Sequence, residues 1–96
     1  MANKVIKIEN QKSTIEWTSY LATAYAEGFC EGEGATLIEQ LEAWAVLIQT
    51  RLAYSLQGFF GRTASNLIQK GIISEIGVID WEVVESMNED NEDSEF

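Results

Sequence analysis

Two segments of the chain carry apolar residues at helical spacing, and the first covers residues 14–28. Its apolar stripe consists of Trp17, Leu21, Ala24, Tyr25 and Gly28. Ser13 and Glu16 have the spacing of a capping box, in which the serine hydroxyl accepts a bond from a free backbone N–H and the glutamate reaches back. The pattern therefore predicts a first helix over residues 14–28.

The second helical segment, residues 37–56, is apolar over most of its circumference. Thr36 and Glu39 form another capping box at its start, after a glycine-rich turn. The narrow polar strip, which we expect to face solvent, consists of Glu39, Glu42, Gln49 and Gln57. A helix with so little polar surface must be buried on several sides. We expect a second subunit to cover the sides that this small chain leaves open.

A third helix is predicted over residues 62–70. Gly58 and Gly61 flank two phenylalanines and are expected to end or kink the second helix. Gly71 follows a lysine and is expected to end the third helix with a left-handed cap.

Two short segments have the pattern of β-structure. Residues 4–9 alternate and are β-branched, which predicts a short strand. Residues 72–79 predict a small hairpin that this strand could join. Asp80 is expected to cap a short helix over residues 81–87. The predicted fold class is mainly α: a small helical domain, made of a helical hairpin and a third helix, with a minor β-hairpin and a short N-terminal strand.

The last ten residues differ in composition from the rest. Residues 87–96 hold five carboxylates and no base, and they end on Phe96. Such a run cannot bury enough apolar surface to fold alone, so we predict one domain over residues 1–86 followed by a flexible acidic tail. The net charge of −10 divides equally between the two parts. The body is therefore acidic as well, and it would repel phosphate backbones and anionic membranes.

The acidic tail has two interpretations. It could be a solubilising segment, or it could bind a basic groove, with the terminal aromatic and its α-carboxylate seated in an arginine-flanked pocket. The residues expected to contact a partner are Glu89, Asp90, Glu92, Asp93, Glu95 and Phe96. The last residues resemble the acidic, Phe-ending tails of single-stranded-DNA-binding proteins, although they lack the proline that those tails often carry.

Residues 62–79 suggest an alternative partner. A polar helix followed by glycine and a hairpin resembles the recognition helix and wing of a winged-helix domain, and the resemblance implies DNA contacts from Arg62, Asn66 and Lys70. The chain has six bases against sixteen acids, which makes nucleic acid the less favoured partner.

Composition narrows the chemistry further. The single cysteine, Cys30, indicates a reducing compartment, and with no histidine the chain cannot build a thiolate- or imidazole-rich metal site. No nucleophile–base pairing is visible, so we expect no enzyme activity, cofactor or metal. No signal peptide or membrane span is expected, because charged and amide residues interrupt the longest apolar segment. These features predict a cytoplasmic protein without membrane partners.

Aromatic and apolar residues of the second helical segment and of the two phenylalanines that follow it are the expected means of self-association. They are Trp44, Leu47, Ile48, Tyr54, Phe59 and Phe60. The sequence thus predicts a non-enzymatic, self-associating adaptor or inhibitor that binds a basic, nucleic-acid-handling protein. In size and charge it is similar to phage and plasmid accessory factors that act by charge mimicry. A structural subunit of a virion or another complex is the remaining alternative.

Overall fold

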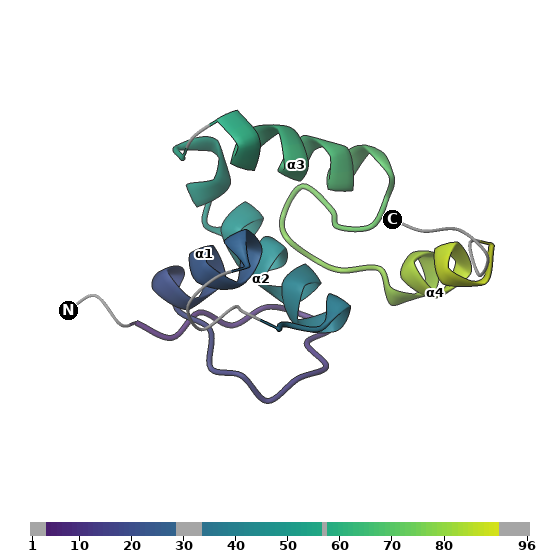
Figure 1. The fold of residues 1–96 in the computed structure, drawn as a ribbon, viewed down its shortest axis with the longest axis horizontal. Helices are drawn as coiled ribbons and strands as arrows, with labels where there is room; N and C mark the ends of the chain where they lie inside the picture. The colour runs from purple at the N-terminus through teal and green to yellow at the C-terminus, as the bar shows by residue number, and fades with distance from the viewer. Residues whose placement is uncertain (1–3, 29–33, 57, 91–96) are drawn as a thin grey trace.

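Helices make up most of the described chain (Figure 1). The structure is a computed structural model that describes residues 4–28, 34–56 and 58–90, with the backbone alone for 87–90. The elements in order are α1 (Ser19–Glu27), α2 (Leu37–Gln49), the 3₁₀-helix η2 (Leu52–Tyr54), α3 (Gly58–Gln69) and α4 (Trp81–Asp90). The prediction of a mainly helical protein is confirmed.

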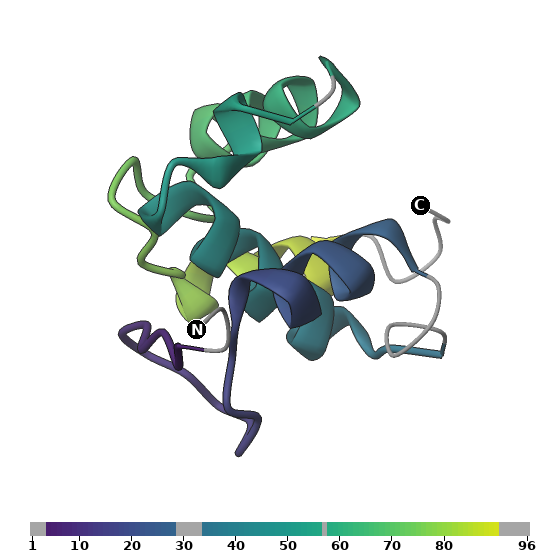
Figure 2. The same ribbon diagram turned by 90° about the vertical axis from the view of Figure 1, so that its left-hand side faces the viewer.

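Helices α1 and α2 pack against each other as a pair (Figures 1 and 2). Gly28 ends α1 in the left-handed region, with φ 84°, and its N–H donates to the Ala24 carbonyl at 2.8 Å. The predicted capping box begins α2: the Thr36 hydroxyl accepts from the Glu39 N–H at 3.2 Å, and the Glu39 carboxylate accepts from the Thr36 N–H at 3.0 Å. Local cap chemistry therefore fixes both ends of the connection.

Helix α2 lies at the centre of the fold, and its own chain covers it. All eight residues from Leu41 to Ile48 are buried. The buried side chains that complete this core come from segments before and after α2, and they include Trp17, Phe60, Ile73 and Ile79. The expectation that a second subunit would cover α2 is wrong, because side chains of residues 8–17 and 60–79 of the same chain pack on it.

Helix α1 begins five residues later than predicted. Thr18 is its N-cap, and the threonine hydroxyl accepts from the Leu21 N–H at 3.2 Å. Ser13 does not cap a helix, because its N–H and its hydroxyl both donate to the Glu42 carboxylate, at 2.8 and 2.6 Å. A long-range contact thus replaces the local capping box that the sequence suggested.

Helix α2 ends earlier than predicted, and α3 begins earlier. After Gln49, the Thr50 hydroxyl donates to the Val46 carbonyl at 2.9 Å, and Arg51 takes a left-handed conformation with φ 67°. The glycines that were expected to break a helix instead lie inside the first turn of α3. The buried ring of Phe60, which packs on Trp44 with centroids 5.7 Å apart, holds this turn in place.

The predicted strand and hairpin are wrong: residues 4–28, 34–56 and 58–90 contain isolated β-bridges and no strand. Ile6 pairs with Trp17 instead of with the 72–79 segment, and Ile73 pairs with Ile79. The second pairing stops after one bridge because Asp80 follows at once and caps α4, which begins at Trp81. The side chains of this turn still enter the core.

A buried carboxylate joins α2 to the N-terminal segment. The Glu42 side chain is fully buried, and its oxygens accept four hydrogen bonds. The donors are the Lys12 N–H at 2.7 Å, the N–H and hydroxyl of Ser13, and the Trp17 indole N–H at 3.1 Å. The expectation that Glu42 faces solvent is therefore wrong. A buried charge without a base is tolerated only when its lone pairs are satisfied, as these are.

Gly77 lies directly against the backbone of α2. It has φ 87°, and a Cβ built there would be 2.7 Å from the Ala45 carbonyl oxygen and 2.8 Å from the Gln49 Cβ. Only glycine allows both this conformation and this close approach. Gly77 therefore sets how tightly the 72–79 turn packs on α2.

We predict that Glu42→Gln lowers the free energy of unfolding by about 2–4 kcal/mol. Glutamine keeps the shape but presents an NH₂ donor to at least one N–H that now donates to the carboxylate. Urea unfolding followed by tryptophan fluorescence measures the loss. Glu39→Gln on the same helix is the control, because glutamine can still complete a capping box. Equal, small changes in both variants would contradict the structural role of Glu42.

We predict that Gly77→Ala destabilises the protein by about 2–4 kcal/mol, since it adds a steric clash to backbone strain. Gly34→Ala is the matched control. Gly34 also has a positive φ, 79°, but nothing lies within 4 Å of its added Cβ, so only the strain remains. Thermal unfolding of the two variants separates the effect of the steric clash from the effect of backbone strain. A Gly77→Ala variant no less stable than Gly34→Ala would show that the turn does not need its close approach.

Candidate interaction surface

Helix α4 presents carboxylates to solvent along one side. Glu82 and Glu85 are exposed, and Val84 on the opposite side is buried. The helical backbone of α4 continues through Glu89, four residues after Glu85. We call Glu82 and Glu85, together with the helix position of Glu89 that continues their spacing, the acidic stripe. Part of the charge that the sequence assigned to a tail thus belongs to a helix.

Asp80 caps α4 as predicted. Its Oδ1 accepts from the N–H groups of Glu82 and Val83, at 3.1 and 3.3 Å. The helix continues to Asp90, three residues beyond the predicted end. The first four residues of the predicted tail, 87–90, therefore have helical backbone, and residues 91–96 lie outside the described chain.

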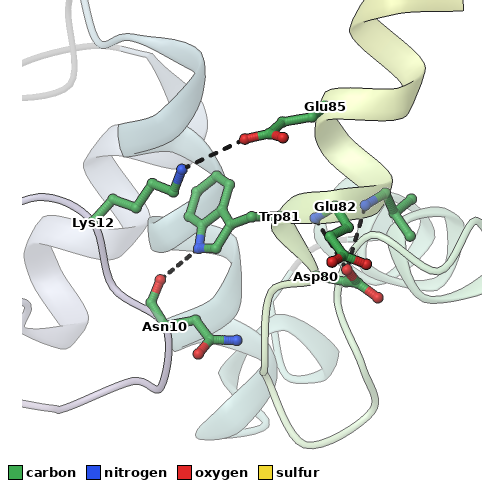
Figure 3. Close-up of polar contacts among 7 residues, drawn as sticks. Asn10, Lys12, Asp80, Trp81, Glu82 and Glu85 are labelled. Atoms are coloured by element: carbon green, nitrogen blue, oxygen red, sulfur yellow. Dashed lines mark hydrogen bonds and ion pairs between the residues drawn. The ribbon is translucent and has the colours of Figure 1, made fainter.

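Trp81 anchors the start of α4 to the N-terminal segment (Figure 3). Its indole N–H donates to the Asn10 carbonyl at 2.5 Å. The Lys12 ammonium lies 4.8 Å from the centroid of the indole ring and 4.0 Å from the Glu85 carboxylate. This exposed ion pair contributes little to stability, so the indole and its hydrogen bond carry the contact.

Asn10, whose carbonyl accepts the Trp81 hydrogen bond, is itself held in place by its backbone conformation and its side chain. It has φ 65°, a conformation that asparagine tolerates better than most residues, and its side-chain amide donates to the Ile79 carbonyl at 2.9 Å. The adjacent N–H groups of Lys12 and Ser13 bind Glu42 of α2. The turn over residues 10–13 therefore connects the central helix to α4.

The charge of α4 opposes its own helix dipole at the C-terminal end. Its last turn contains no base, and its sequence there is Asn-Glu-Asp. Carboxylates near a helix C-terminus are unfavourable by a few tenths to about 1 kcal/mol each. The helix thus carries charge that its own stability does not require.

An open depression of about 620 Å³ lies beside the anchored end of α4. Its lining combines apolar side chains of α3 and the 72–79 turn with carboxylates at the start of α4, and includes Ile68, Val78, Asp80, Trp81 and Glu82. An aliphatic stem that ends in a positive charge suits such a wall, because the stem packs on the apolar part and the charge meets the acids.

The residues predicted for partner binding are only partly described. Glu89 and Asp90 belong to the backbone of α4, and nothing is described of their side chains. Glu92, Asp93, Glu95 and Phe96 lie outside the described residues, so the pocket-binding role of the terminal aromatic stays a prediction.

Most of the residues predicted for self-association lie in the core of a single chain. The buried ones are Trp44, Leu47, Ile48 and Phe60. Tyr54 and Phe59 are about half exposed, at 46% and 47%. The prediction that these four buried residues mediate self-association is wrong, because their side chains already make contacts within the chain. The misassignment came from counting apolar residues on α2 without the segments that cover it.

Arg62, Asn66 and Lys70 are exposed and follow one another at intervals of four residues on α3. The resemblance to a winged helix does not extend to the wing, because the 72–79 segment forms one bridge instead of a hairpin. Helix α3 also packs mainly on η2 and not along α2. The three polar residues nevertheless share one accessible helix face.

Other kinds of site find no support in the described chain. No group of three or more potential metal ligands comes together in residues 4–28, 34–56 and 58–90. None of the helices described is long and apolar enough to cross a membrane. The buried Glu42 carboxylate is fully engaged by hydrogen-bond donors of the protein, and its role is structural.

The fold and its surface define a small, mainly helical protein that displays an acidic helix held by a tryptophan. Residues 30–90 match the model of a family described as a domain of unknown function (DUF7417), and the chain belongs to this family. The match includes α2, η2, α3 and α4. No curated protein and no solved structure matches the chain.

We predict that Trp81→Ala loosens α4 while leaving the α1–α2 core folded. Loss of the indole should lower the free energy of local opening of α4 by about 1–3 kcal/mol, because no comparable contact ties the start of this helix to residues 10–12. Hydrogen exchange of the amides of residues 84–90 measures this opening. Trp81→Phe, which keeps a ring but removes the N–H donor, should show a smaller effect. Unchanged exchange in the alanine variant would show that α4 is held by other contacts.

Proposed function

We propose that this protein is a non-enzymatic interaction protein that binds a basic protein partner through α4 and the acidic segment that follows it. The observation that carries the proposal is the acidic stripe on a helix anchored at one end. Its carboxylates at the C-terminal end cost helix stability, and a basic partner would offset that cost.

The depression beside Trp81 supports the same choice of partner. A lysine or arginine side chain entering it would pack on Ile68 and Val78 and bring its charge to Asp80 and Glu82. Proteins that handle nucleic acids present such side chains in their binding grooves, because they bind phosphates. Occupying that groove with carboxylates is the charge mimicry that we propose for this adaptor or inhibitor, and we place it in the cytoplasm.

We predict that the double variant Glu82→Gln/Glu85→Gln binds a synthetic lysine-rich peptide about tenfold more weakly than the unmodified protein does at moderate salt. Isothermal titration calorimetry measures the affinity. The matched control is Glu9→Gln/Glu27→Gln, which removes the same charge from exposed positions outside α4. The control should lose much less affinity. Equal losses would show that net charge, and not the acidic stripe, governs binding.

A chain that stops after Asp90 tests the remaining part of the proposal, because it removes residues 91–96 without shortening α4. A further loss of affinity is expected, since three more carboxylates are absent. Affinity that neither decreases with salt nor responds to any of these changes would exclude charge mimicry.

A further inference from the structure

The charges of this protein are segregated along the chain. Residues 43–74 contain no acid, although the whole chain has sixteen. The same stretch holds three of the six bases: Arg51, Arg62 and Lys70. All three are exposed, and among the described residues none of them forms an ion pair. An overall acidic molecule thus has one region of positive charge.

Helix α3 arranges part of this region into a line. Its inner face buries Phe60 and Ala64, while Arg62, Asn66 and Lys70 lie on the outer face. Lys70 continues the helical spacing just past the end of α3, because its N–H donates to the Asn66 carbonyl at 3.1 Å. We call Arg62, Asn66 and Lys70 the basic stripe.

The basic and acidic stripes lie on separate parts of the molecule. Figures 1 and 2 show α3 and α4 running in different parts of the molecule, although Ile68 near the end of α3 and Glu82 at the start of α4 line the same depression. One molecule therefore presents two accessible helix faces of opposite charge.

We propose that the basic stripe of one copy binds the acidic stripe of a second copy, with α3 and α4 antiparallel. Arg62 and Lys70 are eight residues apart, a rise of about 12 Å, and Glu82 and Glu89 are seven apart, a rise of about 10.5 Å. The antiparallel arrangement pairs Arg62 with the position of Glu89, and Lys70 with Glu82. It also brings the positive end of the α3 dipole to the negative end of α4.

A second copy fits the basic stripe better than nucleic acid does. Two bases on a molecule of net charge −10 give little attraction to a polyanion, whose binding depends on neutralising several phosphates. An acidic helix, in contrast, offers discrete charges at matching spacing. At 0.15 M salt, screening over about 8 Å limits the repulsion between the two acidic bodies to nearby charges.

The contact joins two different faces, so it is heterologous, and it produces open chains of molecules instead of a closed dimer. Each exposed ion pair contributes little, so the association is weak and grows with protein concentration. The inference uses the acidic stripe of the proposed function. A basic partner and a second copy would therefore compete for α4.

Sedimentation velocity over a range of protein concentrations tests the proposal with two charge-reversed variants. The first is Arg62→Glu/Lys70→Glu, and the second is Glu82→Lys/Glu85→Lys. The unmodified protein should sediment faster as its concentration rises. Each variant alone should stay monomeric, because both of its stripes then have the same sign. An equimolar mixture should associate again, because each reversed stripe meets its complement.

Controls with matched charge separate this contact from the effect of net charge. Lys4→Glu/Lys7→Glu and Glu9→Lys/Glu27→Lys make the same two changes at exposed positions outside both stripes, and both should associate like the unmodified protein. Circular dichroism checks that every variant is folded.

Several outcomes would overturn the proposal. They are a protein that stays monomeric at all concentrations, association that persists in both reversed variants, and a mixture that stays monomeric. Binding of a single-stranded DNA oligonucleotide that is lost in Arg62→Glu/Lys70→Glu would assign the basic stripe to nucleic acid instead. The proposed function is tested independently of this contact. The lysine-rich peptide should still bind the Arg62→Glu/Lys70→Glu variant, because α4 is unchanged in it.

Discussion

The buried carboxylate of Glu42 is the interaction on which the rest of the structure depends. Within the described chain it faces four hydrogen-bond donors and no base, so its charge is stabilised by dipoles alone. Three of the donors come from Lys12 and Ser13, which fixes the turn at residues 10–13 against α2. The same turn provides the Asn10 carbonyl oxygen, which accepts a hydrogen bond from the Trp81 indole N–H. Removing the carboxylate would leave several buried donors without partners, which is costlier than the loss of one hydrogen bond.

The position of α2 explains how so short a chain builds a hydrophobic core. A 96-residue domain buries roughly 60–65% of the surface that its unfolded chain exposes, less than a larger domain does, so each buried residue matters. Here the stretch of α2 from Leu41 to Ile48 is buried, and its cover comes from α1, the N-terminal segment, Phe60 of α3 and the 72–79 turn. Because Gly77 lacks a side chain, the 72–79 turn can pack directly against the backbone of α2. Because the apolar residues are used inside the chain, the outer helices remain free to carry charge.

The surface that results is divided by sign. Helix α4 carries the acidic stripe and is attached through the Trp81 indole and the buried Val84. Helix α3 carries the basic stripe, and it contacts η2 and, through Phe60, Trp44 of α2. Both helices therefore lie at the periphery, where charged side chains avoid the cost of desolvation. The charge mimicry that we propose would act through electrostatic complementarity, which favours fast and salt-sensitive binding. The contact between two copies that we propose rests on the same division of charge.

The sequence by itself determined the features that depend on neighbours in the chain: the mainly helical character, the capping box at Thr36, the glycine end of α1 and the Asp80 cap. It also showed the acidic character of the last segment. Only the tertiary structure decided that Glu42 is buried, that the first helix begins at Ser19, that α2 ends at Gln49 and that the expected strands are single bridges. The reason is that helical periodicity shows which side of a helix is apolar but not which distant segments will cover the polar side. The donors that hold Glu42 lie 25 to 30 residues away in the chain, beyond the reach of any local pattern.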